Sequence, residues 1–250
     1  MLRWVQSCSS TQDILAKSTP EVTAVATLDQ TDGRGRRGRA WQSATGSSLA
    51  LSWRAPVAML DVAYLPLISL AAGVALYRWV SQVNSTGNHG HDTVSQLHLK
   101  WPNDLLFKKR KLAGILCEGR IDQAGQSVLV GIGINLSKHP SFPPMSSSLD
   151  EVISTMTECD GFEESWVLEK TPQLITELER SVHELTSKPN HLLDRWRTYG
   201  LPLGEPLKAA GYVGRYGGIN DQGALLLDIG QRVISVEGGE VNLISSIPNQ

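Results

Sequence analysis

Residues 96–136 read QLHLKWPNDLLFKKRKLAGILCEGRIDQAGQSVLVGIGINL and contain three short apolar runs. These runs span Gln96–Trp101, Leu112–Glu118 and Ser127–Leu136, and turn-forming residues at Lys108–Lys111 and Asp122–Gln126 separate them. Apolar runs of this length bounded by turns predict β-strands joined by hairpin-like connections. The stretch therefore predicts the centre of a β-sheet.

The segments around this stretch show both strand and helix patterns. Short apolar, β-branched runs predict further strands, and apolar residues at helical spacing predict helices. The expected strands are Val22–Leu28 and Leu49–Trp53, and the expected helices are Ser10–Lys17, Val62–Val83, Glu163–Thr186 and His191–Tyr199. Such a mixture predicts an α/β fold, a mixed sheet with helices packed on it.

The composition of the chain changes after Gly200. Glycine and proline residues separate five short β-type runs, which are Leu207–Ala209, Tyr212–Arg215, Ala224–Asp228, Val233–Val236 and Val241–Ile244. Short strands at tight spacing with glycine turns predict a small all-β barrel. We therefore expect two domains, residues 1–200 and residues 201–250.

Composition narrows the class of protein. The chain is 41% hydrophobic and 19% charged, so it can bury a core, and its net charge of -2 offers no general attraction for nucleic acid. Cys8, Cys117 and Cys159 have no zinc-ligand spacing, and the first residues do not resemble a signal peptide. We expect a reduced cytoplasmic protein.

Two further segments have simple interpretations. Ala55–Tyr77 is long and apolar, but Pro56, Asp61 and Pro66 interrupt it, so a buried helix is favoured over a membrane span. Asn84–Thr93 is polar throughout and is expected to form a surface loop.

The arginine loop, defined here as Gly33–Trp41, carries the strongest functional pattern. It reads GRGRRGRAW, in which glycines can expose backbone N–H groups to an anion and arginines add planar charged forks. The Trp offers a stacking face for a purine. A dinucleotide-binding turn is disfavoured because a strand follows, not a helix. A nucleic-acid patch and an idle solvated loop remain as alternatives.

Two lysine-containing motifs lie in the predicted sheet. KWPND at 100–104 has a proline that forces an extended or turned path, which presents Asn103 and Asp104 at a strand end. KLAGIL at 111–116 opens the next strand with Lys111, whose ammonium could reach a phosphate oxygen. Taken singly, the lysines read as solvated cations and the Asn-Asp pair as a turn.

A third motif, GIGINL at 131–136, places alternating glycines in a strand, which lets a ligand or another backbone approach closely; a bulged strand is the alternative. No metal-ligand spacing, no Ser/His/Asp arrangement and no GxxxxGK[ST] loop is present. We therefore expect no resident metal.

The chain resembles the biotin–protein ligases in an ordered series of motifs. They are Ser10-Thr11-Gln12, GRGRRGR with Trp41, KWPND, KLAGIL and GIGINL. The resemblance runs from Ser10 to Leu136 and more weakly through the C-terminal barrel. It implies an α/β catalytic domain of the class II aminoacyl-tRNA synthetase type with a small SH3-like C-terminal barrel.

The resemblance also implies roles for individual residues. Lys111, Arg34 and Asp104 are the expected catalytic residues, with Lys111 reaching the biotin carboxylate and the α-phosphate. The expected biotin-binding residues are Ser10, Thr11, Gln12, Gln30, Gly33, Arg34, Gly35, Arg36, Lys111, Gly114 and Gly133. The expected ATP- or adenylate-binding residues are Arg37, Arg39, Trp41, Asn103 and Asn135, with Trp41 beside the adenine.

Three departures from the family pattern stand out. Gln12 occupies the position where the family usually has Asn, and Ala44 stands in a loop that often reads Ser-Pro-x-Gly. In addition, the catalytic pattern begins within the first dozen residues, which leaves no room for the N-terminal DNA-binding domain of some members.

The expected reaction follows from the charges. Biotin carboxylate and ATP are both anions, so the cations would offset their repulsion while biotinyl-AMP forms, and Mg²⁺ on the triphosphate would add to this. A lysine of a biotin carboxyl carrier protein then attacks, with Asp104 as the candidate base. DNA and membranes are not expected partners, and the resemblance is compatible with a homodimer.

Three rival functions remain from the sequence alone. A lipoate–protein ligase or octanoyltransferase shares the fold, although GRGRRGR and KWPND favour biotin. A biotin-responsive DNA-binding regulator and an RNA-binding module built on the arginine loop belong to other classes.

Overall fold

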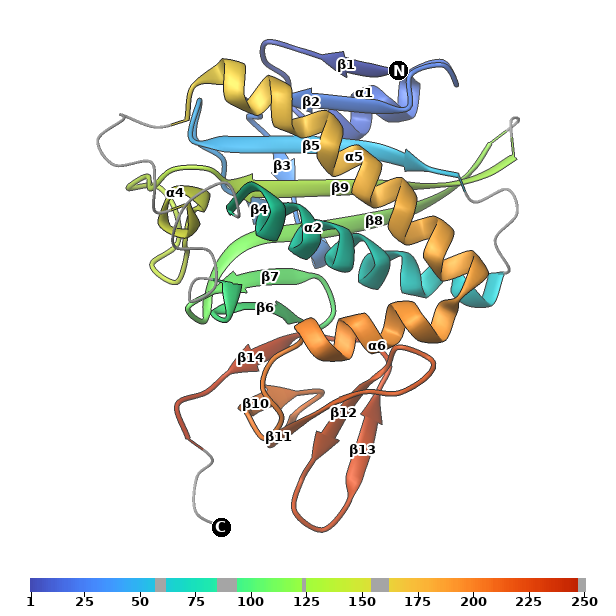
Figure 1. Ribbon diagram of the computed structural model, residues 1–250, viewed down its shortest axis with the longest axis vertical. Helices are drawn as coiled ribbons and strands as arrows, with labels where there is room; N and C mark the ends of the chain where they lie inside the picture. The colour runs from blue at the N-terminus through green and yellow to red at the C-terminus, as the bar shows by residue number, and fades with distance from the viewer. Residues whose placement is uncertain (57–61, 85–93, 123–124, 154–161, 247–250) are drawn as a thin grey trace.

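A seven-stranded sheet forms the centre of the computed structural model, which describes residues 1–56, 62–84, 94–122, 125–153 and 162–246 (Figure 1). The strands lie in the order β1 (Leu2–Trp4), β2 (Ala24–Thr27), β5 (Ser48–Ala55), β9 (Gly125–Asn135), β8 (Arg110–Asp122), β7 (Asp104–Phe107) and β6 (Leu97–Lys100). β1 and β2 are parallel and every other neighbouring pair is antiparallel. The expectation of a mixed sheet is confirmed.

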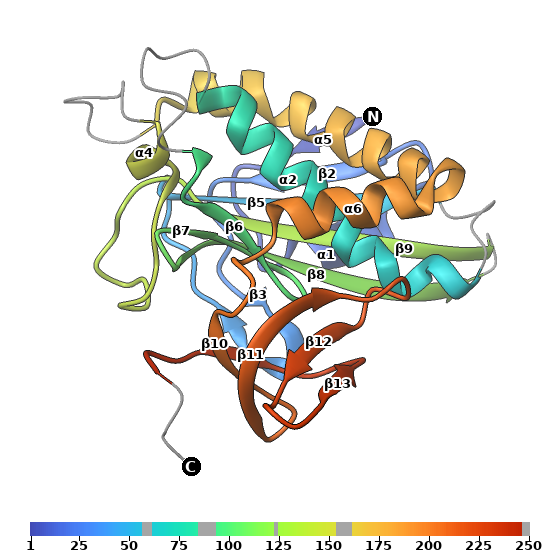
Figure 2. The same ribbon diagram turned by 60° about the horizontal axis from the view of Figure 1, so that its bottom comes forward.

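The three long helices cover one face of this sheet. α2 (Ile68–Asn84), preceded by a 3₁₀ segment at Val62–Leu67, packs on β6, β7 and β8, and α5 (Glu164–Ser187) packs on α2 and β5. α6 (Pro189–Tyr199) packs on both α2 and α5, and the short α4 (Leu149–Val152) lies near the end of β9 in sequence. Figure 2 shows α2, α5 and α6 on one side of the sheet, with the barrel on the other side of α6, and the short helix α1 (Thr11–Lys17) packs on β2, β5 and β9 from the opposite face.

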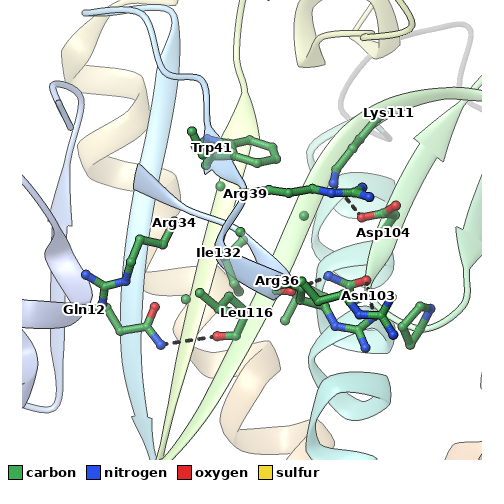
Figure 3. Close-up of a pocket in the computed structure, with 18 of the residues that line it drawn as sticks. Gln12, Arg34, Arg36, Arg39, Trp41, Asn103, Asp104, Lys111, Leu116 and Ile132 are labelled. Carbon is green, nitrogen blue, oxygen red and sulfur yellow. Dashed lines mark hydrogen bonds and ion pairs between the residues drawn. The ribbon is translucent and has the colours of Figure 1, made fainter. Parts of the chain in front are cut away.

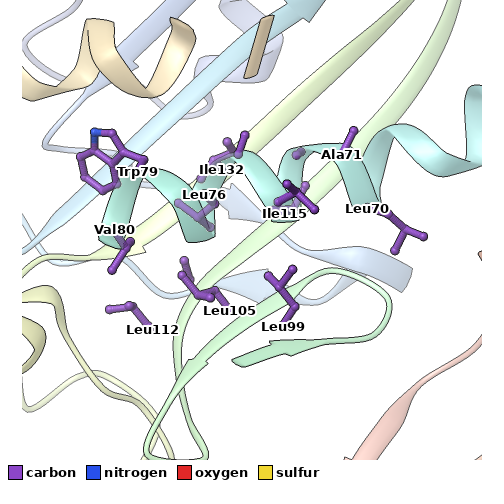
Figure 4. Close-up of a cluster of buried hydrophobic side chains, with 14 of the residues drawn as sticks. Leu70, Ala71, Leu76, Trp79, Val80, Leu99, Leu105, Leu112, Ile115 and Ile132 are labelled. Atoms are coloured by element: carbon purple, nitrogen blue, oxygen red, sulfur yellow. The ribbon is translucent and has the colours of Figure 1, made fainter. Parts of the chain in front are cut away.

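The main core lies between α2 and the sheet (Figure 4). Leu76 and Val80 of α2 are fully buried near Leu105, Ile115 and Ile132, which lie on three neighbouring strands. Tyr64–Val83 is apolar and long enough to cross a membrane, but 67% of it is buried inside the protein. Burial against the sheet accounts for its apolar character, as the interrupted sequence predicts.

The second sheet follows α6 and has five antiparallel strands. Its order is β13 (Val233–Val236), β12 (Leu225–Asp228), β11 (Tyr212–Ile219), β10 (Pro206–Ala209) and β14 (Val241–Leu243). The predicted runs therefore all form strands, with β11 longer than expected. The barrel residues Leu207, Tyr216 and Leu225 belong to the same continuous apolar core as the first sheet.

The structure adds elements that the sequence pattern did not show. β7 lies between two predicted strands, because Leu105–Phe107 is too short a run to distinguish from the preceding turn. The arginine loop contains a short hairpin, in which β3 (Gly33–Arg34) pairs with β4 (Ala40–Trp41) and a 3₁₀ turn at Arg36–Gly38 joins them. The predicted polar loop after Asn84 lies outside the described residues.

Candidate active site

The register of the sheet places the floor residues of the site side by side. Strand residues two apart point to the same face, so the face opposite α2 can be followed across β5, β9, β8 and β7. One row on that face consists of Ala50, Gly133, Gly114 and Asp104, and the next consists of Ser52, Gly131 and Leu116. Because three of the four residues in the first row are Ala or Gly, the sheet has a shallow trough there that ends at a carboxylate.

The indole ring of Trp41 lies in this trough. A Cβ atom at Gly133 would lie 2.6 Å from Trp41 Nε1, and one at Gly114 would lie 3.0 Å from Trp41 Cζ3. Only glycine permits such a close approach. Trp41 Nε1 is buried without a hydrogen-bond partner among the described residues. The ring therefore occupies a place that a flat ligand group can share or take over.

A cavity of about 190 Å³ opens above the trough. Its walls come from α1 (Thr11–Lys17), the arginine loop, the turn between β6 and β7, and residues 239–241 of the barrel. Most of the predicted site residues line it: Ser10, Thr11, Gln12, Gln30, Arg34, Gly35, Arg36, Arg37, Arg39, Trp41, Asn103, Asp104, Lys111, Gly114 and Gly133. Residues up to 231 positions apart in the chain, from Ser10 to Val241, thus meet at one cavity.

Two predicted site residues do not line the cavity. Gly33 packs against Gln30 and Trp41, where a side chain would collide with both. Asn135 is buried and donates its Nδ2 hydrogens to the carbonyl oxygens of Lys111 (3.3 Å) and Ser147 (3.0 Å). Asn135 therefore supports the backbone at the start of the KLAGIL segment, outside the cavity that the nucleotide was expected to share with it.

One end of the cavity is lined by buried neutral polar groups. Ser10 is the N-cap of α1 and accepts the backbone N–H of Asp13. Thr11 donates its backbone N–H to Gln30 Oε1 at 2.9 Å, and its hydroxyl lies 2.8 Å from Ser52 Oγ. Ser52 is a pocket residue that the sequence did not single out, because a Ser inside an apolar strand has no distinctive pattern.

Gln12 extends along the same floor. Its Nε2 donates to the carbonyl oxygens of Leu116 and Leu129, both at 3.4 Å, and its Oε1 lies so close to Gly131 that a Cβ there would collide with it. Figure 3 shows Gln12 reaching toward Leu116 at the end of the cavity opposite Lys111. The longer Gln side chain thus reaches the backbone of β8 and β9, and its amide remains in the cavity lining.

The opposite end holds one carboxylate between two ammonium groups, of which Figure 3 labels Lys111 beside Asp104. Asp104 Oδ1 lies 2.7 Å from Lys111 Nζ, and Asp104 Oδ2 lies 2.7 Å from Lys100 Nζ. Burial raises the pKa of Asp104, but the two ammonium groups outweigh it and hold the pKa below its ordinary value of 3.8. Lys111 Nζ also lies 5.3 Å from the centre of the Trp41 ring, a cation–π contact.

The arginine loop is attached at both ends by ion pairs. Arg34 makes a two-pronged contact with Asp13 of α1, at 2.7 and 2.8 Å, and Glu118 lies 3.7 Å away. Arg39 makes the same kind of contact with Glu240 of the barrel. These partners raise the pKa of both guanidinium groups. Two of the four arginines are therefore already paired within the protein.

Arg36 differs from its neighbours because it is half-buried in the cavity wall. Its Nη1 donates to Asn103 Oδ1 at 3.4 Å and to the Gly239 carbonyl oxygen at 3.3 Å, and no carboxylate of the described residues is hydrogen-bonded to it. Burial and the adjacent Arg37 lower the pKa of Arg36. A half-buried cation with only neutral hydrogen-bond partners is suited to bind an anion.

Asn103 and the exposed Arg37 complete this wall. Asn103 Nδ2 donates to the Ile115 carbonyl oxygen at 2.6 Å, which fixes the turn of KWPND against β8. Arg37 adopts a left-handed conformation with φ 59° and contacts no carboxylate within the described part of the chain. Within the same described ranges, no group of three His, Cys, Asp or Glu residues could hold a metal ion.

Two charged residues of the cavity have ion-pair partners that the sequence did not predict: Lys100 pairs with Asp104, and Glu240 pairs with Arg39. Lys100 stands in the KWPND motif, but its contact with Asp104 depends on the β6–β7 pairing that the sequence did not reveal. Glu240 is 201 residues from Arg39 in the chain, and no local pattern predicts such a contact.

Comparisons with known proteins agree on one family. A sequence model of the biotin/lipoate A/B protein ligase family matches residues 4–135. The biotin–[acetyl-CoA-carboxylase] ligase of Mycobacterium tuberculosis is 30% identical over 246 residues, covering 94% of this chain and 86% of that protein. The bifunctional ligase/repressor BirA of Bacillus subtilis is 27% identical, covering 94% and 71%.

Solved structures show the same fold. The biotin protein ligase of Aquifex aeolicus in complex with biotin and ATP superposes with a TM-score of 0.76 at 24% identity, covering 98% of this chain and 99% of that one. The Leishmania major biotin protein ligase in complex with biotinyl-5-AMP superposes with a TM-score of 0.64 at 21% identity, covering 98% of each. The expected architecture, a mixed-sheet domain with a small C-terminal barrel, is confirmed.

Proposed function

The chain belongs to the biotin/lipoate A/B protein ligase family, and we propose that it activates biotin with ATP as biotinyl-AMP and transfers biotin to a lysine of a carrier protein. The family match and the named relatives identify the chain as a ligase. Biotin and ATP are the substrates bound in the Aquifex neighbour, and the relatives named as biotin ligases support the same pair here.

The observation that carries the choice of biotin is the separation of polar and cationic ends in one cavity. The ureido ring of biotin presents two N–H donors and one carbonyl acceptor, and the end formed by Thr11, Gln12 and Ser52 offers buried hydroxyl and amide partners. A lipoyl or octanoyl chain offers these groups no donor or acceptor, so it would forgo the additional hydrogen bonds that the ureido ring can make, each worth about 0.5–1.5 kcal/mol. The polar end therefore favours biotin over the acids of the sister enzymes.

The cationic end suits the activation step. With the ring at the polar end, the carboxylate of biotin points toward Lys111 and Arg36, where the α-phosphate would also lie. A carboxylate oxygen attacks the α-phosphorus, the bond to the bridging oxygen breaks, and pyrophosphate leaves. Lys111 and Arg36 offset the repulsion between the two anions and the charge that develops in the transition state.

The structure suggests narrower roles for two expected catalytic residues. Asp104 has both oxygens occupied by lysines and a lowered pKa, so we assign it to holding those lysines before any role as a base. Arg34 is paired with Asp13, so we assign it to positioning the arginine loop. Trp41 would move within the trough to stack on the adenine.

Magnesium would arrive as part of the MgATP substrate. The triphosphate oxygens would supply its ligands, since the described residues form no acidic cluster. In the second step, the neutral carrier lysine attacks the acyl carbon, AMP leaves, and the amide product retains biotin.

We propose a biotin carboxyl carrier protein or domain as the partner, because relatives are named biotin–[acetyl-CoA-carboxylase] ligases. We place the protein in the cytoplasm, where ATP is available, and the free thiols of Cys8 and Cys117 agree with a reducing compartment.

The test is ATP–pyrophosphate exchange by the purified protein with biotin, lipoate or octanoate as the only acid. The proposal predicts exchange with biotin and at least about 100-fold less with the other two, the loss of roughly two buried polar contacts. Equal or greater exchange with lipoate or octanoate would contradict the proposal and would indicate a lipoate–protein ligase or octanoyltransferase.

A further inference from the structure

Asp104 contacts two ammonium groups that differ in exposure. The Lys111 side chain is 38% exposed and lies beside Trp41 in the trough, whereas the Lys100 side chain is 17% exposed. Lys100 and Asp104 are also directly paired residues at the end of the β6–β7 hairpin. Lys100 is therefore held in place, while Lys111 is free to turn into the cavity.

The proposed reaction requires Lys111 to change partners. When its ammonium turns to the carboxylate and phosphate of the substrates, it leaves Asp104 Oδ1. A buried carboxylate without a cation is unstable and tends to take up a proton or to hold its remaining partner more tightly. The second ammonium decides which of these happens.

We propose that Lys100 is a positioning residue that keeps Asp104 ionised while Lys111 binds the reacting anions. This inference rests on the proposed function for the step in which Lys111 moves. Lys100 thereby lets Lys111 alternate between Asp104 and the substrates without leaving a buried charge unpaired. Lys100 itself need not touch the substrate.

The other charged groups around Asp104 do not replace Lys100. Arg36 and Arg39 of the arginine loop are near enough to interact electrostatically with Asp104, but Arg36 is hydrogen-bonded to Asn103 and Gly239. Arg39 is paired with Glu240, which faces Lys100 from the barrel. Among the described residues, only the two lysines are ion-paired directly with Asp104.

A purely structural role for Lys100 predicts a different result. If Lys100 only closes the hairpin, replacing it lowers stability and scales activity by one factor at every pH. If it keeps Asp104 ionised, replacing it moves the acidic limb of the pH profile upward. The pH profile therefore separates the two roles.

The experiment compares Lys100→Met, Lys100→Arg and the control Lys108→Met, which removes an exposed lysine of the neighbouring turn. The kcat/KM of biotin-dependent pyrophosphate exchange is measured against pH. We expect Lys100→Met to move the midpoint of the acidic limb to a pH about one unit higher or more, because a single adjacent cation lowers a carboxyl pKa by that amount. Lys100→Arg and Lys108→Met should keep the wild-type limb. An unmoved limb in Lys100→Met overturns the proposal.

A second measurement needs neither turnover nor the Lys100 variant. In Lys111→Met with ¹³C-labelled aspartate, the Asp104 carboxyl is titrated by NMR and assigned by its loss in Asp104→Asn. The proposal predicts that Lys100 alone still holds the Asp104 pKa below its ordinary value. A pKa at or above that value overturns it. If wild type shows no exchange with any acid, the proposed function fails, and this titration still decides the role of Lys100.

Discussion

At the scale of single residues, Lys111 is defined by its surroundings more than by its position in the sequence. Its ammonium contacts Asp104 and the Trp41 ring, and its backbone N–H is fixed by the Met145 carbonyl oxygen at 2.8 Å. The backbone is thus anchored while the side chain is partly exposed to the cavity. This arrangement suits a cation that moves between a resting partner and a substrate.

We expect Lys111→Met to lose about 10²–10³-fold in exchange rate, since electrostatic donors at a reacting centre contribute about that much. The melting temperature should stay near the wild-type value, because Lys100 remains paired with Asp104. Lys138→Met, which removes an exposed lysine on another loop, is the control. A Lys111→Met protein that exchanges within a few-fold of wild type would remove Lys111 from the mechanism.

Asp104 makes a prediction about stability and pH. Its pKa is lower in the folded protein than its ordinary value, so its ionised form stabilises the fold above that value, and the stabilisation is lost as pH falls through the folded pKa. Asp104→Asn should therefore cost about 1–3 kcal/mol near neutral pH, because it leaves the partly buried Lys100 and the more exposed Lys111 without their counter-charge. The cost should shrink as the pH falls below about 4, where the unfolded wild-type chain takes up the proton, and it should vanish as the pH falls through the lower pKa of the folded protein. Urea unfolding of both proteins across this range measures it, and a pH-independent difference would contradict the ion-pair account.

The sequence could predict these residues only in part. Lys111, Asp104 and Arg36 lie in motifs dense enough in charge and glycine to be noticed. Lys100 was treated as a solvated cation, because its role depends on its pairing with Asp104. That pairing exists only because residues 104–107 form β7 beside β6, and the sequence did not predict β7.

At the scale of elements, the arginine loop is a short hairpin held between α1 and the barrel. The pairs Arg34–Asp13 and Arg39–Glu240 attach its two ends, and Trp41 fills the trough beneath it. The sequence indicated a loop and not this hairpin, because two-residue strands leave no periodic pattern. The glycines of GIGINL were correctly expected to permit a close approach, but not to accommodate Trp41.

Gly133→Ala tests the trough. Its new Cβ would collide with the Trp41 ring, so the ring must move and the trough would be filled from below. We expect biotin affinity measured by titration calorimetry to fall at least about tenfold, equivalent to about 1.4 kcal/mol, within the range for overpacking a tight site. Gly119→Ala in the neighbouring strand, where a Cβ meets nothing within 4 Å, should bind normally. Equal affinity in both variants would show that ligand does not use the trough.

At the scale of the whole molecule, the barrel is part of the site. Residues 239–241 line the cavity, and Trp101 Nε1 donates to the Gly223 carbonyl oxygen at 2.9 Å. Gly223 also packs closely on Leu67, which directly precedes α2, and on Leu70, which lies within it. The change in composition at Gly200 predicts the boundary between the sheets, but composition cannot reveal that both sheets share one core.

Glu240→Gln should therefore affect catalysis without unfolding the barrel. The variant removes the charge that holds Arg39, so the arginine loop loses its attachment to the barrel. We expect a several-fold higher KM for ATP and faster release of biotinyl-AMP. The melting temperature should change little, because the ion pair is largely exposed to solvent. Glu237→Gln, on the same turn, is the matched control, and an unchanged KM with unchanged adenylate release in Glu240→Gln would confine the barrel to a structural role.

The central claim is that this cavity activates biotin for transfer to a protein lysine. The most direct measurement is intact-mass spectrometry of a biotin carboxyl carrier domain after incubation with the purified protein, MgATP, and equal concentrations of biotin, lipoate and octanoate. The account predicts one biotinyl group on one carrier lysine, and none when the protein carries Lys111→Met. A carrier that gains a lipoyl or octanoyl group instead, or that remains unmodified with wild-type protein, would contradict it.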